Sequence, residues 1–146
     1  IMGGSYGGFM TSWVIGNYPK MFKSAIVERA LINWETMVGT SDIGIGFPEM
    51  YLLDEMDNNL NLYRKKSPIT YAKNIISPTL IIHSENDYRC PVEQSEQLFS
   101  TLKRNNVESA MIRFPNEGHE LSRSGKPVHR KQRFDFIVDW HKEHLS

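Results

Sequence analysis

The 146-residue sequence lacks most of the features that point to a membrane, a nucleic acid or a disulfide framework. Its single cysteine, Cys90, cannot form an internal disulfide, which fits a reducing compartment. No apolar run approaches the roughly 20 residues that span a bilayer, and no signal sequence opens the chain. The 17 basic and 17 acidic side chains cancel, so long-range attraction recruits neither nucleic acid nor an anionic membrane. We therefore expect a cytoplasmic protein with no nucleic-acid or membrane partner.

Patterns that would bind a metal or a cofactor are also missing. No spacing of His, Cys and Asp suggests a metal site. The glycine cluster at residues 3–8 is explained by a catalytic turn, described below, so we infer no nucleotide site. The chain opens with Ile1-Met2-Gly3-Gly4, without an initiator methionine, and these residues indicate the end of a strand. We expect no cofactor, no metal, and a chain that is a piece of a longer protein.

Short apolar runs alternate with longer segments of helical period, which predicts parallel βα units. The expected strands are Ile1-Met2, Ser24–Val27, Pro78–His83 and Ser109–Phe114, and the expected helices run from Ser5 to about Gly16, from Val92 to Lys103 and from Pro127 to Leu145. The segment from Leu31 to about Leu62 is hard to assign and is typical of a binding loop or cap over a site. The fold class is therefore α/β, the C-terminal half of a doubly wound, mainly parallel sheet with helices on both faces.

The segment Gly3-Gly4-Ser5-Tyr6-Gly7 fits the pattern G-x-S-x-G, the nucleophile elbow between a strand and a helix. The turn is too tight for most side chains, and it lifts the serine hydroxyl above the sheet edge. It also directs the first backbone N–H groups of the helix at negative charge that forms nearby. The alternative is a glycine-rich turn without catalysis. The strand before it and the helical pattern after it favour Ser5 as a nucleophile.

Two further strands end in polar loops that carry candidate partners. Asp87 follows the strand Pro78–His83, and the carboxyl ends of such strands are where doubly wound folds place their sites. Asp87 could instead be a turn residue or cap the helix near Val92, and Glu85 is a rival acid. His119 follows the strand Ser109–Phe114 and suits a general base, with a surface-loop histidine as the alternative. The other histidines are poorer candidates because they lie in a strand or near the last helix: His83, His129, His141 and His144.

The order of these residues is more informative than any one of them. Ser5, Asp87 and His119 each follow their own strand, and serine, acid, histidine is the chain order of α/β-hydrolases. Two other familiar serine-protease folds use different orders. The sequence therefore predicts a catalytic triad of these three residues.

The motifs resemble those of a known family. The residues that carry the resemblance are Gly3-Gly-Ser-Tyr-Gly-Gly8, Asp87-Tyr-Arg-Cys-Pro91, and Glu117-Gly-His119 followed by Ser124-Gly-Lys-Pro127. They look like the catalytic domain of prolyl oligopeptidase-family serine peptidases, and in particular of the acylaminoacyl-peptidase and dipeptidyl-aminopeptidase-like enzymes. The resemblance covers nearly the whole chain. It implies that residues 1–146 are the C-terminal part of an α/β-hydrolase catalytic domain, with the N-terminal β-propeller and the first strands absent from this sequence.

The same resemblance implies roles for individual residues. Ser5 would form an acyl-enzyme, His119 would shuttle the proton, and Asp87 would orient His119. The backbone N–H of Tyr6 would be one oxyanion-hole donor, while a second would come from a loop outside this sequence. Loss of one such donor can cost about 10²–10³ in rate, so the 146 residues alone could be inactive. Arg89 would bind substrate, although it could also be a surface arginine paired with an acid. Ser84 departs from the family, in which glycine is common at that position.

Several residues have simpler interpretations. Phe9, Trp13 and Trp140 lie in helical patterns and are expected in the core, and Cys90 is expected to be a small buried hydrophobe rather than a nucleophile. A set of residues in the cap-like segment has two equally open interpretations, as core residues or as the lining of a pocket for the substrate side chain: Trp34, Met37, Phe47, Met50 and Tyr51.

The expected function is hydrolysis of short peptides near the N-terminus, which releases an acylated residue or a dipeptide. Two alternatives stay open: a carboxylesterase or lipase-like hydrolase, and a catalytically inert interaction module. The strand at Ser24–Val27 would have only Ile1-Met2 to cover one side, and such an edge favours pairing with another chain. We therefore expect a homo-oligomer.

Overall fold

The computed structural model describes residues 1–145 and has an α/β fold. In chain order its elements are β1 (Met2–Gly4), α1 (Tyr6–Asn17), β2 (Ala25–Glu28), α2 (Trp34–Thr40), α3 (Phe47–Leu52), α4 (Leu60–Lys66), the 3-10 helix η1 (Pro68–Asn74), β3 (Thr79–Ser84), α5 (Val92–Arg104), β4 (Ser109–Phe114), α6 (Leu121–Ser124) and α7 (Pro127–Leu145). The expected strands and the three expected helices are confirmed, with bounds that differ by at most two residues.

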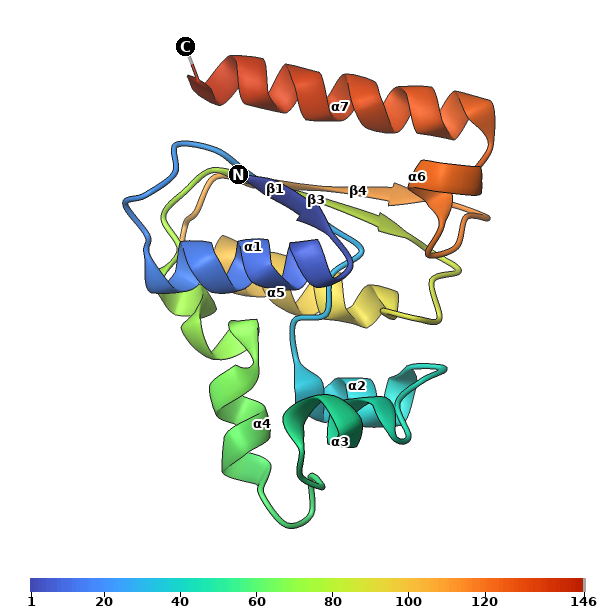
Figure 1. Ribbon diagram of the computed structural model, residues 1–146. Helices are drawn as coiled ribbons and strands as arrows, with labels where there is room; N and C mark the ends of the chain where they lie inside the picture. Colours follow the sequence, from blue (N-terminus) through green and yellow to red (C-terminus); the bar gives the residue numbers. More distant parts are fainter. Residues whose placement is uncertain (146) are drawn as a thin grey trace.

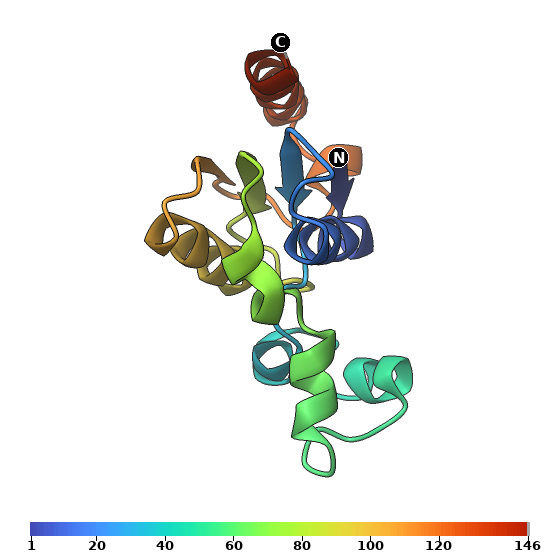
Figure 2. The ribbon, with the colours of Figure 1, turned by 90° about the vertical axis from the view of Figure 1, so that its left-hand side faces the viewer.

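The sheet is parallel throughout, in the order β1-β2-β3-β4, which confirms the predicted fold class. Successive side chains of its strands alternate between two cores. Ala25, Val27 and Ile81 pack toward α1 and α5, whereas Ile26 and Leu80 pack toward α7. Figures 1 and 2 show the resulting layers, with α7 on one face of the sheet and α1 and α5 on the other. Both faces are covered, as a largely apolar parallel sheet requires.

The segment after β2, to which the sequence pattern assigned no secondary structure, forms three short helices. Asn33 caps α2 by accepting a hydrogen bond from the Glu35 N–H, and Asn59 caps α4 in the same way. Helices of six or seven residues show less than two turns of apolar period, so the sequence pattern could not reveal them. The helices η1 and α6 were missed for the same reason. In Figures 1 and 2, α2, α3 and α4 lie beyond α1 and α5, away from the sheet.

Parallel pairing brings the carboxyl ends of all four strands to one edge of the sheet. Gly4 at the end of β1 pairs with Glu28 at the end of β2, and Glu28 pairs with Ile82. The buried Glu28 carboxylate forms a two-fold ion pair with Arg133 of α7, which ties that helix to the same edge. Residues that directly follow the strands are therefore collected above this edge.

Candidate active site

Ser5 lies in a sharp turn between β1 and α1. Its backbone has φ 60°, a conformation that is uncommon for a residue other than glycine, and its N–H donates to Glu28 O at 3.0 Å. A Cβ on Gly3 would lie 2.4 Å from Gly7 O, and one on Gly8 would lie 2.6 Å from Glu28 O, so both positions require glycine. Gly7 has open space around it, so the pattern G-x-S-x-G includes a glycine that packing does not demand.

Asp87 lies in the loop after β3 and is buried. Its Oδ1 accepts hydrogen bonds from the backbone N–H groups of Arg89 at 3.0 Å and of Cys90 at 2.9 Å. Its Oδ2 accepts one from His119 Nδ1 at 2.8 Å. Both carboxylate oxygens are therefore satisfied, as a buried charge requires. Glu85, the rival acid, is exposed and lies 3.3 Å from Arg113 instead.

His119 lies in the loop after β4, held by the buried side chain of Glu117. The Glu117 carboxylate accepts from the Lys126 N–H at 3.0 Å and contacts His129 Nδ1 at 2.6 Å. A Cβ on Gly125 would lie 2.6 Å from Leu121 atoms, which explains why the motif Ser124-Gly-Lys-Pro127 needs glycine at this position. The motif therefore anchors the loop that carries His119.

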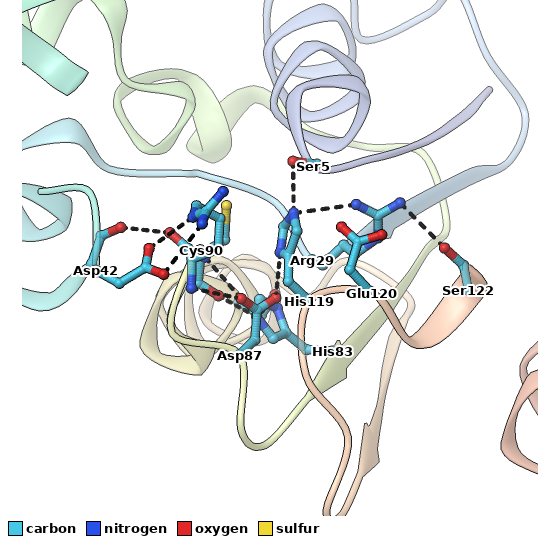
Figure 3. A network of polar contacts seen from close by, with 12 residues as sticks. Ser5, Arg29, Asp42, His83, Asp87, Cys90, His119, Glu120 and Ser122 are labelled. Atoms are coloured by element: carbon cyan, nitrogen blue, oxygen red, sulfur yellow. Dashed lines mark hydrogen bonds and ion pairs between the residues drawn. The ribbon is translucent and has the colours of Figure 1, made fainter. Parts of the chain in front are cut away.

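The three predicted residues form one hydrogen-bonded chain (Figure 3). His119 Nε2 lies 2.9 Å from Ser5 Oγ, and His119 Nδ1 lies 2.8 Å from Asp87 Oδ2. If the imidazole donates from Nδ1 to the carboxylate, Nε2 is free to accept the serine proton. Burial opposes ionisation of Asp87, but the hydrogen bond from His119 and contacts with His83 and the N–H of residue 90 outweigh it. They lower the pKa of Asp87 to about 2, so the acid is a carboxylate at neutral pH.

A cavity of about 300 Å³ opens in front of Ser5. One wall is apolar and comes from α1, the strand end and the helices after it: Phe9, Leu31, Trp34, Met37, Ile43 and Phe47. Trp34, Met37 and Phe47 thus line the cavity, and so does Phe9, which we expected only in the core. Met50 is exposed, and Tyr51 stacks on Trp34 at 5.6 Å behind that wall.

Arg89 also lines the cavity, but its guanidinium is engaged by a carboxylate. Its Nε donates to Asp42 Oδ1 at 2.7 Å and its Nη2 to Asp42 Oδ2 at 3.3 Å. The hydrogen bond and the charge of Asp42 raise the Arg89 pKa. The Ser41 hydroxyl also donates to Arg89 O at 2.7 Å. This hydrogen bond and the ion pair between Arg89 and Asp42 join the segment after α2 to the loop that carries Asp87.

Two further residues with reactive side chains, Cys90 and His83, are buried and lie outside the hydrogen-bonded chain of Ser5, His119 and Asp87. Cys90 is buried, and burial followed by the charge of Asp87 raises its pKa to about 12, so it is a thiol at neutral pH. Buried His83 lies between Ser95 Oγ at 2.6 Å and Cys90 O at 2.7 Å. Within residues 1–145, no three His, Cys, Asp or Glu side chains gather as a metal site requires, and no helix is both long and apolar enough to cross a membrane.

Sequence reasoning missed three charged residues that line the cavity: Arg29, Glu120 and Arg123. Arg29 directly follows β2, at the same sheet edge as Asp87 and His119. The rule that pointed to those two residues, a polar side chain directly after a parallel strand, would also have found Arg29.

Comparison with known proteins gives consistent matches. A model of the prolyl oligopeptidase family matches residues 1–146. The "Uncharacterized peptidase YuxL" of Bacillus subtilis is 44% identical over 145 residues, which are 99% of this chain and 22% of that protein. The Pyrococcus horikoshii acylaminoacyl peptidase superposes with a TM-score of 0.93 at 36% identity, covering 99% of this chain and 24% of that one. An acylaminoacyl peptidase in complex with Z-Gly-Gly-Phe-chloromethyl ketone superposes with a TM-score of 0.90 at 37% identity, covering 97% of this chain and 23% of that one. The chain spans less than a quarter of the length of each.

The depressed pKa of Asp87 makes the stability of the fold depend on pH. The carboxylate contributes stability above its ordinary pKa of 3.8, and this contribution is lost as the pH falls toward the folded value of about 2. Between pH 4 and pH 2 we expect the unfolding free energy of the wild type to fall by about 2 kcal/mol more than that of Asp87→Asn. Urea unfolding across this range measures both. Glu85→Gln, which keeps Asp87, should retain the wild-type loss, and equal pH dependence in wild type and Asp87→Asn would contradict the assignment.

Proposed function

The chain belongs to the prolyl oligopeptidase family, and we propose that it carries the nucleophile, base and acid of a serine peptidase that hydrolyses short peptides near their N-terminus. The observation that carries the proposal is the hydrogen-bonded chain from Ser5 through His119 to Asp87 at the wall of a cavity. The likeness to acylaminoacyl peptidases favours release of an acylated residue, or of a dipeptide.

Each residue has one role in the proposed reaction. Ser5 Oγ attacks the scissile carbonyl while His119 Nε2 takes its proton, and the bond that forms gives an acyl-enzyme. His119 then returns the proton to the leaving amine, and water hydrolyses the acyl-enzyme by the same path. Asp87 fixes the imidazole orientation and stabilises its charged form. The Tyr6 N–H, at the first position of α1, has no acceptor within the helix and can donate to the oxyanion.

The cavity supports an assignment of the substrate side chain. Its apolar wall fits a large apolar residue before the scissile bond, because desolvating such a side chain contributes about 1.5–3 kcal/mol. Arg89 also lines the cavity, and its remaining N–H donors can bind a substrate carbonyl while Asp42 holds the guanidinium in place. An esterase would use the same triad, but the D-x-R-x-P element at Asp87–Pro91 and the family membership favour a peptidase.

Matched substrates test this proposal. We expect acetyl-Phe-Ala to be hydrolysed after Phe. Its hydrolysis rate should be comparable to that of acetyl-Phe methyl ester, because the proposed site can protonate an amine leaving group. Ser5→Ala should lower kcat/KM for both by about 10³-fold or more. Ser124→Ala removes an exposed hydroxyl of α6 and should leave both rates unchanged.

Two outcomes would contradict the proposal. Hydrolysis of the ester without any of the peptide would indicate an esterase. Rates that persist in Ser5→Ala would mean that another group is the nucleophile.

We also propose that copies of the chain associate. Within residues 1–145, β1 pairs only with β2, so its outer edge presents unpaired backbone groups, which favour strand pairing with another copy. We expect light scattering at micromolar concentration to give a dimer or larger species, and a purely monomeric species would count against this. The cytoplasmic location stays a prediction from the sequence.

A further inference from the structure

Three arginines line the cavity, and one of them differs from the other two. Arg89 pairs with Asp42, and Arg123 pairs with Glu120 at 2.5 Å. Arg29 forms no ion pair of this kind within residues 1–145, although the Glu120 carboxylate, which pairs with Arg123, lies close enough for its charge and that of Arg29 to attract each other. Because Asp42 and Glu120 supply two negative charges against three arginines, one positive charge is left in excess.

Arg29 is held beside the nucleophile by both backbone and side chain (Figure 3). Arg29 directly follows β2, and its backbone has φ 37°. The Arg29 backbone N–H donates to Ile82 O at 2.9 Å. A Cβ on Gly4 would lie 3.2 Å from the Arg29 Cζ and Nη2 atoms, so the guanidinium packs against the backbone just before Ser5. The glycine at position 4 thus makes room for a cation next to the reacting hydroxyl.

The hydrogen bonds of the Arg29 guanidinium are few and long. Nη1 lies 3.3 Å from His119 Nε2, and Nη2 donates to Ser122 Oγ at 3.3 Å. Nε is covered and has no partner. A guanidinium has five N–H donors, and a partly buried one is stabilised most by a carboxylate that accepts two of them. The Arg29 site therefore favours an anion that enters from the cavity.

The position of Nη1 indicates which anion can reach it. In the proposed reaction the leaving nitrogen must come within about 2.6–3.2 Å of His119 Nε2 to receive its proton. The α-carboxylate of a single leaving residue begins only two bonds from that nitrogen, about 1.46 and 1.52 Å long. Because Nη1 lies 3.3 Å from the same Nε2, this carboxylate is within reach of the guanidinium.

We propose that Arg29 binds the free α-carboxylate of the leaving residue, so the site prefers peptides in which the scissile bond precedes the last residue. This inference rests on the proposed function, since it places the leaving amine at His119. Arg29 takes no part in the bond changes, in which water supplies OH to the acyl group and a proton to the amine. It is a specificity-determining residue for the leaving group.

Binding to a protein that cannot cleave its ligand tests the inference directly. In the full chain carrying Ser5→Ala, we expect calorimetry to show that acetyl-Phe-Ala binds about tenfold or more tightly than its carboxamide, acetyl-Phe-Ala-NH2. Adding Arg29→Met should abolish this difference by weakening only the carboxylate peptide, and Arg29→Lys should restore part of it. Arg113→Met, on β4 and paired with Glu85 and Glu96 away from the cavity, should leave the ratio unchanged. Arg29→Gln serves as a second neutral variant should circular dichroism show that Arg29→Met unfolds.

Equal binding of the two peptides, or no binding of the carboxylate peptide, overturns the inference. So does a loss of affinity that is the same for both peptides in Arg29→Met, because it would make Arg29 only a positioning residue for His119. Hydrolysis of both peptides by the Ser5 protein separates this result from failure of the proposed function. If both peptides are cleaved at equal kcat/KM and bind equally, the proposed peptidase function stands and the proposed role of Arg29 is wrong. If the two peptides bind with different affinity but neither is cleaved, the role of Arg29 stands and the peptidase function is wrong.

Discussion

The buried carboxylate of Asp87 is the interaction on which the rest of the site depends. A charge withdrawn from water needs hydrogen bonds to both oxygens, and here they come from two separate loops. One oxygen is bound by the backbone of its own loop, at Arg89 and Cys90, and the other by the ring of His119. Because Arg89 also holds Asp42, the same loop fixes the segment after α2 that shapes the cavity. The imidazole, the cavity wall and the acid are therefore positioned together.

The lining of the cavity combines apolar side chains with arginines around one reacting hydroxyl. The apolar side chains come from α1 and from the segment after β2, and the arginines from the segments that follow β2, β3 and β4. Apolar lining gains free energy by burying a side chain, whereas arginine recognises carbonyl or carboxylate groups. A peptide can satisfy both at once because its side chains and its backbone oxygens point in different directions. The hydroxyl of Ser5 belongs to the same lining, where such a chain would be cut.

The sequence was most informative where a short apolar strand ends in a polar residue. Ser5, Asp87 and His119 were found because parallel strands end at a common edge, and chain order then assigned them to one fold. Arg29 obeys the same rule but was missed, since arginine is not a member of the triad pattern and its lack of an acidic partner is visible only in three dimensions. The helices α2, α3 and α4 are too short to show a period. Likewise, only packing distinguishes Gly8, which is required, from Gly7, which is not.

The most direct test of the central claim is whether the Ser5 hydroxyl is activated. A fluorophosphonate probe reacts with a serine only where a base withdraws its proton and the oxyanion is stabilised. We expect the probe to label the chain, peptide mapping by mass spectrometry to place the adduct on Ser5, and Ser5→Ala to abolish labelling. A folded protein that supplies both oxyanion donors and is still not labelled, or labelling that survives in Ser5→Ala, would contradict the claim that Ser5, His119 and Asp87 form a working nucleophile.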